Sequence, residues 1–136
     1  MGSRRKAREC ALQLLYQVDL GSPDLQDTPG CFWSLQEIDS PTREFAMVLF
    51  EGVQKNAAEI DDLLSTYSAN WKVSRMASID KNILRVAIFE LMHCPDIPAK
   101  VTINEAVEIA KNYGTKESGA FVNGILDNIA KKVRQS

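Results

Sequence analysis

The chain has 136 residues, of which 45% are hydrophobic and 25% are charged. At about 150 residues per domain, this length predicts one globular domain over residues 1–136, with enough apolar material for a buried core. The formal net charge of −2 argues against a protein that binds polyanions over its whole surface. The charges are unevenly spread, with a basic start, an acidic middle and a mildly basic end. Such an asymmetry can aim one face of the molecule at an anion.

The cysteines and the apolar runs exclude several other classes of protein. Cys10, Cys31 and Cys94 are an odd number and no two form a CxxC pair, so neither a disulfide framework nor a zinc site is predicted. No apolar run approaches the roughly 20 residues that a membrane span needs. We therefore expect a soluble cytoplasmic protein with no metal, no cofactor and no membrane contact.

The first predicted helix covers residues 4–20. Its apolar residues recur at the i, i+3, i+4, i+7 spacing of one helical face, and they are Ala7, Cys10, Ala11, Leu14, Leu15 and Val18. Glycine, proline and aspartate are too dense over residues 21–30 for a helix. This segment is predicted to be a loop, and a short helix near residues 31–38 is left open.

A long second helix is predicted from Pro41 to about Tyr67. Ser40 is the expected N-cap, and proline suits the first helical position because its missing N–H would have no partner there. The buried face would carry Phe45, Val48, Leu49, Val53, Ile60, Leu63 and Leu64. Gly52 is the expected weak point of this helix.

Three helices are predicted in the second half of the chain. The first runs from Ser78 to about His93 and ends before two prolines. The next begins at Thr102, because Thr102 and Glu105 match the capping-box pattern, and it stops at Tyr113 with a left-handed Gly114. The last covers residues 116–133. Alternating apolar and polar residues are not sustained anywhere, so the prediction is an all-α bundle of six or seven helices.

The sequence offers little for catalysis. The only histidine, His93, lies at a predicted helix C-terminus, where packing or the helix dipole accounts for it. The glycines are too scattered for a phosphate-binding loop. The paired acids are typical of solvated helix faces. The sequence therefore predicts a protein that is not an enzyme.

The basic start is the first candidate binding surface. Arg4, Arg5, Lys6 and Arg8 precede or begin the first helix. Tyr16 falls on the same helical stripe as Arg8, which would place an aromatic ring near basic side chains. Guanidinium groups on phosphates and rings under unstacked bases are typical of single-stranded RNA binding. The alternative is an ordinary solvated N-terminus.

Two further features are candidate contacts. The junction before the last helix combines Tyr113, Lys116 and Phe121 with the free N–H groups of a helix start, which can receive phosphate. The alternative is that Phe121 belongs to the core and that Tyr113 makes a hydrophobic contact at the end of its helix. Glu90 lies in an otherwise apolar helix, so its carboxylate must be paired inside the protein, with Arg85 or another base, or must face a partner.

Three blocks of sequence resemble one known family. They are residues 5–19, residues 82–91 and residues 96–127, and the most specific run is Val101 to Lys111. Together they span nearly the whole chain and resemble the transcription antitermination factor NusB family. The resemblance implies an all-helical fold with two subbundles.

The resemblance also implies a function and its partners. NusB-like proteins pair with NusE, a ribosomal protein, and the pair recognises the boxA element in nascent ribosomal RNA. They join the Nus complex on RNA polymerase and suppress termination. Lys6 stands where many relatives have arginine. Lysine keeps the positive charge but lacks the planar guanidinium group that can bind a phosphate through two hydrogen bonds.

Each candidate residue acquires an expected role from the resemblance. The basic start is expected to bind RNA, together with the junction before the last helix, and Phe89 and Glu90 are expected to face NusE. The expected RNA-binding residues are Arg4, Arg5, Lys6, Arg8, Tyr16, Tyr113, Lys116, Glu117, Ser118 and Phe121.

Two alternatives remain open at this point. The same helical domain occurs fused to ribosomal RNA methyltransferases, so the chain could target such an enzyme in trans. It could also be a structural homodimer with an ordinary basic surface.

Overall fold

The computed structural model describes residues 2–19, 38–68 and 76–134. Within these ranges it contains six α-helices and no strand. The helices are α1 (Gly2–Asp19), α3 (Ser40–Lys55), α4 (Ala57–Tyr67), α5 (Ser78–His93), α6 (Ala99–Tyr113) and α7 (Ser118–Val133). The all-α prediction is confirmed. The short helix left open near residues 31–38 falls almost entirely outside the described residues.

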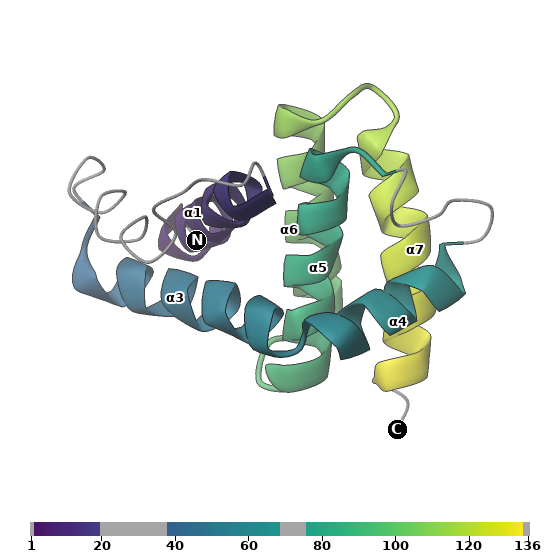
Figure 1. Ribbon diagram of the computed structural model, residues 1–136, viewed down its shortest axis with the longest axis horizontal. Coiled ribbons are helices and arrows are strands. Elements are labelled where there is room, and N and C mark those ends of the chain that lie inside the picture. The colour runs from purple at the N-terminus through teal and green to yellow at the C-terminus, as the bar shows by residue number, and fades with distance from the viewer. Residues whose placement is uncertain (1, 20–37, 69–75, 135–136) are drawn as a thin grey trace.

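Helix α5 is the centre of the bundle and contacts each of the other five helices. Around it, α1 packs mainly on α3, while α6 packs mainly on α7. Figure 1 shows α1 and α3 on one side of α5, with α4 and α7 on the other. One group contains α1 and α3, and the other contains α4, α6 and α7. These groups match the two expected subbundles. Because α5 is enclosed by both groups, its sequence is apolar nearly all round, and Glu90 is one of its few polar buried residues.

The predicted long helix is wrong, because two helices, α3 and α4, occupy its place. The break is at Asn56, not at Gly52. Both the backbone N–H and the side-chain amide of Asn56 donate to the Gly52 carbonyl oxygen, the latter at 2.8 Å. This side chain competes for a helical acceptor, which is how asparagine disfavours helix continuation. Gly52 itself is helical and lies under the ring of Phe89.

The predicted helix ends need three corrections. The N-cap of α3 is Asp39, whose side chain accepts from the Thr42 N–H at 3.0 Å. Hydrogen bonds from the side chain of Thr42 and then from its backbone N–H lower the pKa of Asp39. Helix α6 begins at Ala99, one turn before the expected capping box. Gly114 has φ −101° and ψ −158°, an extended conformation, so the predicted left-handed cap is wrong.

An arginine beyond the last helix fixes the turn between α5 and α6. The guanidinium of Arg134 donates to the carbonyl oxygens of Leu91 at 2.6 Å, and of Cys94 and Ile97 at 3.0 Å each. A cation at a helix C-terminus satisfies carbonyl groups that have no helical partner. The contact ties the end of α7 to the two helices that carry Glu90 and Glu105.

Candidate nucleic-acid interface

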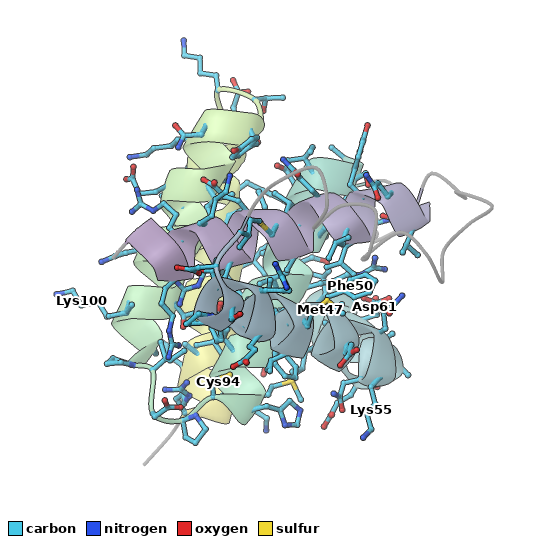
Figure 2. All side chains as sticks on the ribbon, turned by 90° about the vertical axis from the view of Figure 1, so that its left-hand side faces the viewer. Met47, Phe50, Lys55, Asp61, Cys94 and Lys100 are labelled. Carbon is cyan, nitrogen blue, oxygen red and sulfur yellow. The ribbon has the colours of Figure 1, made fainter. Side chains whose placement is uncertain are left out.

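The start of α1 presents two cationic side chains to solvent. Arg4 and Lys6 are both exposed. The Arg4 guanidinium carbon lies 4.1 Å from the centre of the Phe45 ring on α3, so a cation–π contact orients it. Figure 2 faces this side of the molecule, with α1 crossing the column of α6 and α3 running below it. These two residues lie where the sequence predicts an anion-binding surface.

Arg5 is on the same turn but is already paired. Its Nε and Nη2 atoms donate to the two carboxylate oxygens of Glu105 on α6, at 2.7 and 2.9 Å. The side chain of Arg5 is 40% exposed, and that of Glu105 is 23% exposed. The hydrogen bonds from Arg5 lower the pKa of Glu105 and raise that of Arg5. The pair fixes the angle at which α1 crosses α6.

Arg8 points inward, contrary to the expectation that it binds RNA. Its Nε and Nη2 atoms donate to Glu90 on α5 at 2.7 and 2.8 Å, and the two side chains are only 5% and 1% exposed. The Thr102 hydroxyl donates to the same carboxylate at 3.0 Å. An ion pair that loses its hydration needs this bidentate geometry and a third hydrogen bond. The structure therefore assigns Arg8 to the core.

The same contacts decide between the two interpretations of Glu90. Its carboxylate is paired inside the protein, and the partner is Arg8. Arg85 pairs instead with Asp61 on α4, at 2.9 Å. Phe89 is also buried, with its ring against Gly52 of α3. Neither Phe89 nor Glu90 lies on the surface, so the expectation that they face NusE is not supported.

Tyr113 brings the junction before α7 next to α1. Its ring is 44% exposed. Burial of its hydroxyl, followed by the negative charge of Glu9 on α1, raises the pKa of Tyr113. Glu105, in the middle of α6, meets Arg5 near the start of α1, and Tyr113, at the end of α6, meets Glu9 in the middle of α1, so the second half of α6 lies along the first half of α1. The two candidate surfaces therefore adjoin.

The remaining junction residues divide between surface and interior. Lys116 and Glu117 are exposed. Ser118 is buried, and its hydroxyl accepts from the Thr115 N–H at 2.8 Å, so this side chain shapes the turn. Phe121 is half-buried and lines a surface hollow of about 410 Å³ between this turn and the start of α5.

Tyr16 lies further along α1 than the basic residues. It is 38% exposed on α1, but eleven residues of helix separate it from Arg5, roughly 16 Å at 1.5 Å per residue. The residues between them on its stripe, Arg8 and Leu12, are buried. The expected continuous stripe of basic and aromatic side chains on the surface is therefore wrong.

Cys10 and His93, whose side chains could in principle react, both pack against other residues of the protein. Burial raises the pKa of the Cys10 thiol to about 11, which keeps it protonated. His93 packs against the Phe89 ring, with the ring centres 5.2 Å apart. Among the described residues, no group of three or more His, Cys, Asp or Glu side chains is placed to hold a metal ion. None of the helices that the structure describes is long and apolar enough to span a membrane.

The described residues thus form an all-helical bundle, with exposed cations at the start of α1 and an exposed tyrosine and lysine at the junction before α7. The family model of the NusB family matches residues 5–131. The transcription antitermination protein NusB of Desulforapulum autotrophicum is 54% identical, over 95% of this chain and 92% of its own. That of Myxococcus xanthus is 49% identical, over 96% of each chain. The chain belongs to the NusB family.

Solved structures agree with this assignment. NusB of T. maritima has a TM-score of 0.84 and 40% identity, over 95% of this chain and 91% of its own. A structure of the antitermination factors NusB and NusE in complex with dsRNA contains a chain with a TM-score of 0.87 and 25% identity. That match covers 97% of this chain and 98% of the other. Both matches cover at least 95% of this chain.

Proposed function

We propose that this protein is an RNA-binding transcription antitermination factor and acts as an adapter, without catalysing a reaction. Together with NusE it binds the boxA element of nascent ribosomal RNA in the cytoplasm. The pair then joins the Nus complex on RNA polymerase and suppresses termination. The names of its relatives support this proposal, and so does the similar chain found with NusE and RNA.

The observation that carries the proposal is the seam between α1 and the end of α6. Arg4 and Lys6 are two exposed cations near the start of α1, and Tyr113 is a half-exposed residue at the end of α6. Lys116 adds a third cation beyond Tyr113. Phosphates and unstacked bases of single-stranded RNA need this combination of positive charge and aromatic surface. Because the protein as a whole has a net charge of −2, a cationic surface on it is a local feature and does not reflect the overall charge.

The burial of Arg8 decides which basic residues a mutational test of RNA binding should replace. Because Arg8 is buried, its loss would destabilise the protein and lower RNA affinity for the wrong reason. The informative variant is Arg4→Ala/Lys6→Ala, which removes two exposed charges. Lys55→Ala/Lys132→Ala is the matched control, since it also removes two exposed charges, from the ends of α3 and α7. Figure 2 shows Lys55 pointing away from the body of the protein.

The measurement is fluorescence anisotropy of a boxA-containing single-stranded RNA over a range of salt concentrations. The first variant should bind more weakly, and its plot of log affinity against log salt should flatten by about 0.7 for each lost phosphate contact. The control should retain most of the affinity and the full slope. Equal affinities and slopes in the two variants would show that RNA does not bind at the start of α1.

A further inference from the structure

We propose that Glu105 is a positioning residue for RNA binding, which holds Arg5 so that its free guanidinium edge faces a phosphate of the RNA. Glu105 itself does not touch the RNA. This inference rests on the proposed function, because it assumes that RNA lies across the start of α1. It gives a role to an acid that lies beside the basic start of α1.

The geometry of the pair leaves half of Arg5 available. A guanidinium has five N–H donors arranged along two usable edges. Glu105 takes one edge, through Nε and one hydrogen of Nη2, at 2.7 and 2.9 Å. The other edge, made of Nη1 and the second hydrogen of Nη2, has no hydrogen bond to the described residues. Because Arg5 is 40% exposed, this edge can receive a phosphate.

Glu105 is itself held in place. Its carboxylate lies between Arg5 and Arg8, with the Arg8 Nη1 atom 3.9 Å from its Oε1. Arg8 is fixed by its two hydrogen bonds to Glu90, and Glu90 accepts a third from Thr102. Arg5 is thus tied, through Glu105, to a buried network that spans α1, α5 and α6. A side chain that is ordered before binding loses less conformational entropy when RNA arrives.

The charge of Glu105 makes the proposal testable, since two roles predict opposite effects. If Glu105 were only a counter-ion, its removal would make the surface more positive, and RNA would bind more tightly. If Glu105 positions Arg5, its removal frees the guanidinium to rotate, and RNA binds more weakly although the protein gains positive charge.

The experiment compares Glu105→Gln with Glu108→Gln in RNA-binding titrations at several salt concentrations. Glu108 is the matched control, because it lies one turn further along α6 and its replacement changes the charge equally. It pairs with the exposed Lys111 at 3.5 Å, and it acts on Arg5 through its charge but not through a hydrogen bond. We expect Glu105→Gln to lower affinity about twofold to tenfold, the effect of losing one pre-ordered side chain. Its salt slope should fall by up to about 0.7. Glu108→Gln should bind as the wild type does, or slightly more tightly.

Two further variants separate positioning from general damage. Glu105→Asp keeps the charge but draws the carboxylate back by one methylene, so it should weaken binding although the net charge is unchanged. In an Arg5→Ala background, Glu105→Gln should no longer weaken binding, because the residue through which Glu105 acts is gone. Glu105→Gln binding as tightly as Glu108→Gln would overturn the inference, and so would an equal loss of affinity with and without Arg5.

Failure of this inference can be told apart from failure of the proposed function. A wild-type protein whose RNA affinity does not depend on Arg4 and Lys6 contradicts the proposed RNA surface. A protein that needs Arg4 and Lys6 but tolerates Glu105→Gln contradicts only the role of Glu105.

Discussion

At the scale of single residues, four basic side chains near the start of α1 have three different surroundings. Arg4 and Lys6 are exposed. Arg5 is hydrogen-bonded to Glu105 and is partly exposed to solvent. Arg8 is buried and paired with Glu90. In the sequence they form one cluster. Only the helical phase relative to α5 and α6 separates them, and that phase depends on how three distant segments pack.

The buried pair of Arg8 and Glu90 predicts a large loss of stability in Glu90→Ala. Removing one member of a buried ion pair leaves the other charge without a partner, which costs about 3–5 kcal/mol. Arg8→Lys should cost less, because the charge remains while the two-pronged contact is lost. The free energy of unfolding, measured with urea, checks both. A loss under about 1 kcal/mol in Glu90→Ala would contradict the buried pairing.

The lowered pKa of Glu105 predicts a pH-dependent contribution to stability. A carboxyl group with a lowered pKa in the folded protein stabilises it above its ordinary pKa of 4.5, and this contribution is lost as the pH falls through the lowered value. The difference in free energy of unfolding between wild type and Glu105→Gln should therefore be largest near neutral pH and shrink below pH 4.5. Urea titrations at a series of pH values test this. A difference that grows on acidification would contradict the hydrogen bond from Arg5 as its cause.

At the scale of helices, α1 and α5 were predicted within two residues of their observed ends, because their apolar spacing is regular and their limits carry clear signals. The start of α6 was misplaced for a physical reason. Thr102 and Glu105 have the spacing of a capping box, but their side chains make contacts with Glu90 and Arg5 instead. A local pattern cannot show that a distant helix uses the same groups.

The close approach of α3 and α5 predicts opposite effects for two glycine substitutions. A Cβ on Gly52 would lie 2.3 Å from the Phe89 ring, whereas a Cβ on Gly124 would have no neighbour within 4 Å. Gly52→Ala should therefore destabilise the protein by about 1–3 kcal/mol through overpacking. Gly124→Ala should stabilise it by about 0.4–1 kcal/mol through helix propensity.

Thermal and urea unfolding of the two alanine variants provide the measurement, and each variant is the control for the other. Both add one methyl group to a helical glycine, so helix propensity alone would predict a gain in both. Stabilisation by Gly52→Ala would show that α3 and α5 do not approach as closely as the structure places them.

At the scale of the whole molecule, the fold turns two distant basic segments into one surface. Arg5 at the start of α1 and Glu105 in the middle of α6 are 100 residues apart in the chain and are joined directly by hydrogen bonds. The sequence indicated both segments as candidates, and the family resemblance gave them a shared purpose. Their adjacency, and the burial of Arg8, Phe89 and Glu90, follow only from the packing of α1 on α5 and α6.

The proposed function depends on sequence-specific RNA binding in partnership with NusE. The most direct test is anisotropy of a boxA RNA and a scrambled RNA, each titrated with this protein alone and with purified NusE, at two salt concentrations. We predict tighter binding to boxA than to the scrambled RNA, and a larger preference when NusE is present. Equal, weak and salt-sensitive binding to both RNAs, unchanged by NusE, would contradict the account.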